Sequence, residues 1–285
     1  MLLKDIKDIF HKELHRLYPK EEVDSFFYQS IEHFLGLERF VLVLQPEMVL
    51  TKKEEQPLFE TVAHLKLEKP LQYILGKAHF MDLEFVVNEH VLIPRPETEE
   101  LVQWILSDCQ VERSQDLNIL DIGTGSGCIA IALAKYLSGA NVVAMDISEK
   151  ALEVAQENAR NNKVDVSFIK ENVLDPELVL EPKFDIIVSN PPYVRENEKQ
   201  QMKNNVKAFE PHVALFVSDY DPLKFYKSIV RLTEKSLRKG GELYFEVNQY
   251  LSQETWDLLK AHNFSEIELR KDIFGNDRML KAVKK

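Results

Sequence analysis

Residues 121–127, with the sequence DIGTGSG, constrain the fold more strongly than any other segment of the chain. They overlap the end of the apolar run NILDI at 118–122, and a second apolar run, CIAIALAKY, begins directly after them. A strand, a glycine loop and a helix N-terminus together form a nucleotide pocket, because glycines let a ligand approach the backbone while amide N–H groups remain free to donate. The segment therefore predicts a ligand site at the carboxyl end of a strand.

Alternating apolar segments around this loop predict the fold class. Strands are expected at 117–122, 141–146, 165–170 and 184–189, with helices at 126–137 and 149–161. A helix at 222–238, a strand at 242–247, a helix at 251–261 and strands at 265–270 and 278–284 follow. Such alternation predicts an α/β domain with a parallel sheet covered by helices on both faces.

Residues 1–75 show a different periodicity, which predicts a small helical-bundle domain. Apolar residues recur at helical spacing in two segments: Leu3, Ile6, Phe10, Leu14 and Leu17, then Val23, Phe26, Phe27, Ile31 and Phe34. Further helices are expected at 40–44 and 57–67, and Pro70 marks the exit from the bundle. A chain of 285 residues is long enough for two such domains.

The segment 76–95 separates the two patterns. Its apolar residues recur with a period near two, which predicts a β-hairpin linker. The sequence IPRPETE at 93–99 then opens a helix, for which Thr98 is the expected N-cap. The predicted organisation is a helical domain at 1–75, a linker at 76–95 and an α/β domain at 96–285.

The spacing of the glycines limits the ligand. The loop reads G-x-G-x-G, with Cys128 where a dinucleotide fingerprint has its last glycine, and the chain contains no G-x-x-x-x-G-K-[ST] motif. A pyrophosphate or a nucleoside triphosphate is therefore disfavoured. Asp146 ends the next predicted strand, where a carboxylate can accept hydrogen bonds from both hydroxyls of a ribose. The structural alternative is that the glycines only form a tight turn and Asp146 only caps the next helix.

The pattern D-x-G-x-G-x-G followed by a strand-end acid resembles the cofactor site of class I S-adenosylmethionine methyltransferases. The resemblance implies a Rossmann-like, mostly parallel sheet with an antiparallel last strand, and S-adenosylmethionine as the cofactor. Many members carry an Asp at their adenine contact, where this chain has Asn172. The implied cofactor-binding residues are Asp121, Gly123, Thr124, Gly125, Gly127, Asp146, Ile147, Asn172, Val173 and Asn190. No metal ion is expected.

The tetrapeptide Asn190, Pro191, Pro192, Tyr193 follows the strand expected at 184–189. An amide or amino nitrogen shares its lone pair with a π system, so it attacks a methyl group only when that lone pair is turned toward the carbon. The side-chain oxygen of Asn190 and the carbonyl of Pro191 can accept hydrogen bonds from its two N–H groups. The prolines stiffen the turn, and Tyr193 can stack on a flat acceptor. The structural alternative is a plain turn after a strand.

Further segments make nearly the whole chain similar to the HemK/PrmC family of protein-(glutamine-N5) methyltransferases. They are PLQYILGKAHF at 70–80, IPRPETE at 93–99, SNPPYV at 189–194, FEP at 209–211 and DIFGNDR at 272–278. The resemblance implies methylation of the glutamine in the Gly-Gly-Gln motif of class I peptide-chain release factors, with the helical domain docking that substrate. It implies that Asn190, Pro191, Pro192 and Tyr193 are catalytic, and that Asn190, Pro191, Tyr193, Arg95 and Glu97 bind the substrate. For Arg95 and Glu97 the structural alternative is an ion pair at the helix start.

Two other functions stay open at this stage. The NPPY tetrapeptide alone also suits an adenine-N6 methyltransferase acting on DNA or RNA, and a non-catalytic module that sequesters a translation partner is the third hypothesis. The net charge of −11 disfavours direct nucleic-acid binding, which depends on cations that neutralise phosphates. We expect a cytoplasmic monomer without a membrane segment, in which Cys109 and Cys128 are free thiols.

Overall fold

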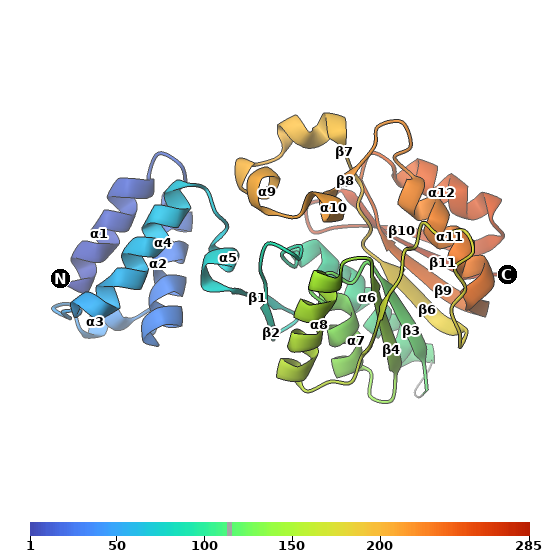
Figure 1. The fold of residues 1–285 in the computed structure, drawn as a ribbon, viewed down its shortest axis with the longest axis horizontal. Coiled ribbons are helices and arrows are strands. Elements are labelled where there is room, and N and C mark those ends of the chain that lie inside the picture. The colour runs from blue at the N-terminus through green and yellow to red at the C-terminus, as the bar shows by residue number, and fades with distance from the viewer. Residues whose placement is uncertain (113–115) are drawn as a thin grey trace. The chain divides into compact units, whose positions relative to one another are not determined.

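The amphipathic segments near the N-terminus fold into a unit of their own. The computed structural model describes residues 1–112 and 116–285. Its chain divides into a helical unit, Met1–Gly76 with Lys203–Phe209, and a sheet unit, Lys77–Met202 with Glu210–Lys285 (Figure 1). The helical unit thus includes residues 203–209, which the sequence prediction had assigned to the α/β domain at 96–285.

The helical unit is a bundle whose first five helices bury apolar residues in a common core: α1 (Leu3–Leu14), α2 (Lys20–Leu35), α3 (Val41–Leu44), α4 (Lys52–Lys66) and α5 (Leu71–Leu75). The unit also includes α9 (Asn204–Phe209), which has no buried residue. The predicted stripes of α1 and α2 form the core, with Leu3, Ile6, Phe10, Leu14, Val23, Phe27 and Ile31 fully buried. Leu17 is an exception, because it lies beyond the end of α1 and is exposed.

Two helix boundaries of this unit differ from the sequence prediction. The helix expected at 57–67 begins at Lys52, because Thr51 and Glu54 form a capping box in which each side chain accepts from the other's backbone N–H. The chain does not leave the bundle at Pro70, which instead directly precedes the short helix α5. Proline is favoured at helix starts because its φ is already set and it lacks the N–H that would stay unpaired there.

The sheet unit is built on seven strands: β3 (Asn118–Ile122), β4 (Asn141–Asp146), β5 (Ser167–Lys170), β6 (Phe184–Ser189), β9 (Leu237–Glu246), β10 (Phe264–Lys271) and β11 (Asp277–Lys284). Their order across the sheet is β10-β11-β9-β6-β3-β4-β5. Strand β11 runs antiparallel to both neighbours, while β9, β6, β3, β4 and β5 are parallel. The predicted fold class is confirmed, and the chain reverses its direction of winding at β3 and β6, where such sheets bind ligands.

Helices cover both faces of this sheet (Figure 1). One face packs against α6 (Pro96–Glu112), α7 (Cys128–Tyr136) and α8 (Glu149–Asn162), and the other packs against α11 (Lys224–Ser236) and α12 (Ser252–Ala261). Successive strand residues alternate between the two cores, as Ile119 and Leu120 do in β3. Cys109 and Cys128 are buried thiols outside any disulfide, as predicted.

The start of α6 corrects one prediction, because Thr98 is not its N-cap. The helix begins at Pro96, so Thr98 lies within the first turn. Its hydroxyl donates to Glu246 at 2.6 Å, which leaves no role for it at the helix terminus. In the described ranges 1–112 and 116–285, no helix combines the length and apolar character that crossing a bilayer requires.

The hairpin expected within the segment 76–95 is present, since strands β1 (Lys77–Phe80) and β2 (Leu83–Val86) pair antiparallel there. Other short elements of the sheet unit were not predicted. Between the NPPY turn and α11 lie β7 (Val194–Arg195), the 3-10 helix η1 (Glu196–Gln201), α10 (His212–Leu215) and β8 (Phe216–Val217), for which periodicity gave no signal. They bring α10 to the carboxyl edge of the central strands, where the candidate site lies.

Candidate active site

A cavity of about 210 Å³ opens at the carboxyl ends of β3, β4 and β6. Nine of the predicted site residues line it: Gly123, Gly125, Asp146, Ile147, Asn172, Val173, Asn190, Pro191 and Pro192. Apolar residues that sequence reasoning missed complete the wall: Val91, Leu92, Val213, Ala214, Phe225 and Ile229. These apolar residues carry no polar motif, so only the folded chain shows that they belong to the site.

The glycine loop has two different roles. Gly125 has a φ of +54° and lines the cavity, so its backbone is open to a ligand. Gly127 does not line the cavity, and a Cβ there would lie 2.9 Å from Ile131 Cδ1 and 3.0 Å from Ala155 Cβ. The absence of a side chain at Gly127 therefore allows α7 and α8 to approach each other closely.

Asp146 ties the glycine loop to the end of β4. Its carboxylate accepts the Gly125 N–H and the Ser148 N–H, each at 2.9 Å. Burial raises the pKa of Asp146, and these backbone donors oppose that effect. The next helix is capped by Ser148, whose hydroxyl accepts from Ala151 N–H. Helix capping therefore does not account for Asp146, which faces the cavity.

Asp121 and Thr124 belong to the segment DIGTGSG but do not line the cavity. Asp121 is fully buried and accepts the Thr124 hydroxyl at 2.6 Å. Burial raises the pKa of Asp121 to about 7. This hydrogen-bonded pair stabilises the turn from β3 into the loop. It would therefore affect cofactor binding indirectly, through the shape of the loop.

The segment after β5 forms the far end of the cavity. Glu171, Asn172, Val173 and Leu174 all line it. The side-chain oxygen of Asn172 accepts the Leu174 N–H at 3.0 Å, which closes an Asx turn. Asn172 thus shapes the wall at the place where the resemblance expects an adenine contact.

The NPPY turn borders the same cavity and is anchored from behind. The Asn190 side-chain nitrogen donates to Thr98 Oγ1 at 3.2 Å. The Tyr193 hydroxyl donates to Glu246 at 2.8 Å, and Tyr193 itself is not among the residues that line the cavity. The predicted stacking of Tyr193 on an acceptor stays a prediction. Sequence reasoning missed Glu246. The sequence did contain a signal for it, because an acidic residue stands near the carboxyl end of the strand expected at 242–247.

Arg95 and Glu97 lie outside the cavity wall. Arg95 pairs with the buried carboxylate of Glu210, which also accepts the Ile93 N–H. The ion pair of Arg95 is therefore with Glu210 and not with Glu97, which was the structural alternative. It connects the segment before α6 to the segment before α10. Pro211 follows directly and precedes α10, whose Val213 and Ala214 line the cavity.

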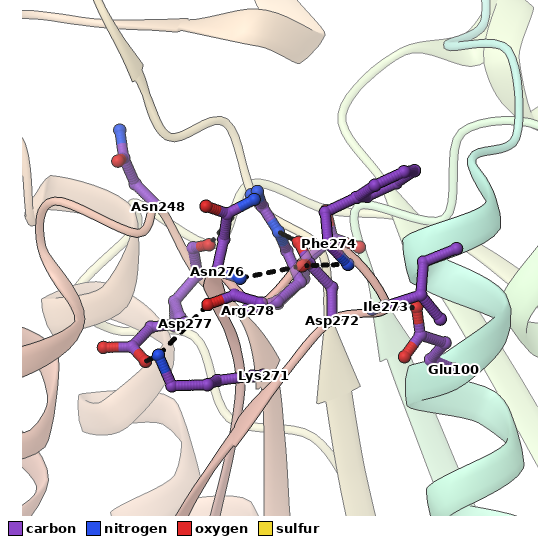
Figure 2. Close-up of polar contacts among 12 residues, drawn as sticks. Glu100, Asn248, Lys271, Asp272, Ile273, Phe274, Asn276, Asp277 and Arg278 are labelled. Atoms are coloured by element: carbon purple, nitrogen blue, oxygen red, sulfur yellow. Dashed lines mark hydrogen bonds and ion pairs between the residues drawn. The ribbon is translucent and has the colours of Figure 1, made fainter.

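The segment DIFGNDR forms a turn between β10 and β11 that is closed by hydrogen bonds to Asp272. The buried Asp272 carboxylate accepts the N–H groups of Phe274 at 3.0 Å and Asn276 at 2.9 Å (Figure 2). It also pairs with Arg278 at 3.1 Å. Arg278 in turn lies 3.5 Å from the hydroxyl of Tyr193. The turn thus places a fixed cation behind the NPPY segment.

The fold and this cavity define a class I S-adenosylmethionine methyltransferase. Residues 101–210 match the family model of the methyltransferase small domain, and residues 15–76 match that of the PrmC N-terminal domain. A solved methyltransferase from Pyrococcus furiosus is 17% identical with a TM-score of 0.52, covering 82% of this chain and 99% of its own. At that identity the similarity shows the fold alone.

Two relatives over nearly the full length show the family. The release factor glutamine methyltransferase of Flavobacterium psychrophilum is 50% identical over 283 residues, which are 99% of each chain. That of Bacteroides thetaiotaomicron is 41% identical over 271 residues, which are 95% of this chain and 96% of the relative. The chain belongs to the release factor glutamine methyltransferase family, and the resemblance drawn from its sequence is confirmed.

Proposed function

We propose that this protein transfers a methyl group from S-adenosylmethionine to the side-chain amide nitrogen of the glutamine in the Gly-Gly-Gln motif of class I release factors. Family membership supports this reaction. The structural observation that carries it is that one cavity is lined both by the glycine loop with Asp146 and by Asn190, Pro191 and Pro192. A methyl donor and an acceptor nitrogen held at these two walls would therefore meet.

The cavity fits the cofactor in its donor set and its polarity. Asp146 would hold the ribose hydroxyls, Gly123 and Gly125 would approach the ligand through their backbone, and the segment 171–174 would border the adenine. The walls are mostly apolar, in agreement with a nucleoside that carries no phosphate. When bound, S-adenosylmethionine supplies an electrophilic methyl group on a sulfonium.

The NPPY turn would orient the acceptor. The Asn190 side-chain oxygen and the Pro191 carbonyl accept hydrogen bonds from the two N–H groups of the glutamine amide, which turns its lone pair toward the methyl carbon. Two prolines restrict this turn, so its acceptors are already in place when the substrate arrives. As the nitrogen bonds to the methyl carbon, the bond between that carbon and the sulfonium sulfur would break, with its electron pair going to sulfur. S-adenosylhomocysteine would be the leaving group, and the nitrogen would afterwards release one proton to solvent.

The helical unit would recognise the release factor away from the reacting glutamine. A single glutamine side chain offers few contacts, so binding energy from a remote surface is needed to position it. We further infer that the protein acts as a cytoplasmic monomer and binds no nucleic acid directly, in keeping with its net charge of −11.

Methyl transfer to defined substrates tests the proposed function. Labelled S-adenosylmethionine is incubated with the protein and an intact class I release factor, the same factor with its Gly-Gly-Gln glutamine replaced by alanine, or adenine-containing DNA and RNA oligonucleotides. We expect label only in the unaltered release factor. Label in an oligonucleotide and none in the factor would favour adenine-N6 methylation, and no label in any substrate would favour a non-catalytic module.

A further inference from the structure

Three polar side chains from distant parts of the sheet unit form a line of hydrogen bonds behind the acceptor site. Asn190 follows β6, Thr98 lies in the first turn of α6, and Glu246 ends β9. Asn190 Nδ2 donates to Thr98 Oγ1 at 3.2 Å, and Thr98 Oγ1 donates to Glu246 at 2.6 Å. Thr98 is 3% exposed and Glu246 1% exposed, so water does not compete for these bonds.

The direction of this line decides which way the Asn190 amide faces. A threonine hydroxyl has one hydrogen, and the carboxylate of Glu246 can only accept it when ionised. The Thr98 oxygen therefore presents a lone pair to Asn190, and only the NH₂ end of that amide can meet it. The carbonyl oxygen of Asn190 diverges from this bond and stays available to accept an N–H from a substrate. Without the line, the two nearly isosteric ends of the amide could exchange.

Neighbouring groups hold Glu246 in place. Its second carboxylate oxygen accepts the Tyr193 hydroxyl at 2.8 Å, and Arg278 acts on it as the nearby cation. Arg278 is itself held by Asp272 at 3.1 Å and by the Val247 carbonyl at 3.3 Å. Burial raises the pKa of Glu246, whereas Thr98, Tyr193 and Arg278 favour its charged form. Glu246 thus anchors Tyr193 directly and Asn190 through Thr98.

We propose that Thr98 and Glu246 are positioning residues that set the Asn190 amide with its oxygen toward the acceptor nitrogen. The proposal rests on the proposed function for its kinetic consequence, but the orientation itself is a property of the protein alone. Neither Thr98 nor Glu246 is among the residues that line the cavity. Both act through Asn190, so their loss lowers turnover and leaves the affinity for S-adenosylhomocysteine nearly unchanged.

The kinetic test compares Thr98→Val with Thr98→Ser. Valine keeps the size and branching of threonine and removes the hydroxyl, so turnover is expected to fall about 10- to 100-fold. Serine keeps the hydroxyl and recovers most of that loss. Thr255→Val is the matched control, because it removes a fully buried hydroxyl in α12 that donates to the carbonyl of the N-cap residue Leu251 and does not line the cavity.

A double-mutant cycle separates positioning from general damage to the fold. If Thr98 acts through Asn190, adding Thr98→Val to Asn190→Ala causes no further loss of turnover. An equal loss in both backgrounds overturns the proposal. It is also overturned if Thr98→Val keeps full turnover, or if Thr255→Val lowers turnover as much.

A measurement that does not depend on methyl transfer tests the orientation of the Asn190 amide without any substrate. The Asn190 side-chain NH₂ signal in the ¹⁵N spectrum of the full-length protein is identified by its loss in Asn190→Ala. We expect it to shift and exchange faster with solvent in Thr98→Val, which removes its acceptor. Glu246→Gln replaces one carboxylate oxygen by a donor, so it should shift the signal less. An unchanged signal overturns the positioning role even if release factor is methylated. If the signal shifts but the parent protein methylates no release factor, the proposed function fails and the orientation stands.

Discussion

Replacing Asp146 by alanine is expected to weaken the binding of S-adenosylhomocysteine, the product form of the cofactor. The Asp146 carboxylate borders the cavity and accepts N–H hydrogen bonds from Gly125 and Ser148, each at 2.9 Å. An ionised carboxylate offers about four lone-pair sites, so about two remain for the hydroxyls of a ribose. Alanine removes these acceptors and also releases the glycine loop from the end of β4.

The expected loss follows from the strength of such bonds. Hydrogen bonds to a charged group contribute about 1.5 to 3 kcal/mol. Because about 1.4 kcal/mol changes a dissociation constant tenfold, affinity should fall about 10- to 150-fold. Asp146→Asn keeps the shape of the side chain but has one acceptor oxygen and no charge, so its affinity should lie between those of the parent and Asp146→Ala.

Calorimetric titration with S-adenosylhomocysteine measures this loss. Glu149→Ala is the matched control: it removes the same charge from a neighbouring side chain that is 71% exposed and paired with Lys170 at 2.7 Å. Since Glu149 does not line the cavity, its loss should change the affinity by less than about twofold. A folded Asp146→Ala protein that binds as tightly as the parent would refute the role of Asp146 in the cofactor site.

Three further outcomes are expected. Asn190→Ala should lower turnover about 100-fold with little change in S-adenosylhomocysteine affinity, and turnover within a few fold of the parent contradicts the role of the turn. Burial raises the pKa of Asp121 from 3.8 to about 7, so the folded protein favours the protonated carboxyl. The contribution of Asp121 to the unfolding free energy is therefore complete below pH 3.8, and it is lost as the pH rises toward 7. The unfolding free energy of the parent should therefore fall by about 4 kcal/mol relative to Asp121→Asn over that interval in urea titrations, and parallel pH profiles contradict this. A chain beginning at Lys77, once shown by circular dichroism to fold, should bind S-adenosylhomocysteine and methylate a short Gly-Gly-Gln peptide. The same chain should methylate intact release factor poorly. Full activity on the intact factor argues against recognition by the helical unit.

The long periodic elements were predictable because burial on one face or both leaves a pattern in the sequence. The strands expected at 141–146 and 184–189 have the bounds of β4 and β6. The glycine loop and Asp146 were found for a related reason, since a tight turn into a helix and a polar side chain at a strand end are local features. Both signals lie within a few consecutive residues.

Features that depend on distant contacts were not predictable. The short elements α5, α10, β7 and β8 are two to five residues long, too few to show a period. Thr98 was interpreted as an N-cap because its bond to Glu246, 148 residues away along the chain, leaves no local signal. For Arg95, the structural alternative of an ion pair with its neighbour Glu97 also considered local sequence only, whereas the folded chain brings Arg95 to Glu210. The contacts that hold the NPPY turn thus come from residues far away along the chain, which only the tertiary structure brings together.

Site-resolved mass spectrometry of a methylated release factor tests the proposed function most directly. An intact class I release factor is incubated with the full-length protein and S-adenosylmethionine, digested, and the peptide that contains Gly-Gly-Gln is fragmented. We expect a single added methyl group on the side-chain nitrogen of that glutamine, and a strongly reduced amount with Asn190→Ala. A methyl group on a different residue, or an unmodified glutamine after prolonged incubation with folded protein that binds the cofactor, would contradict it.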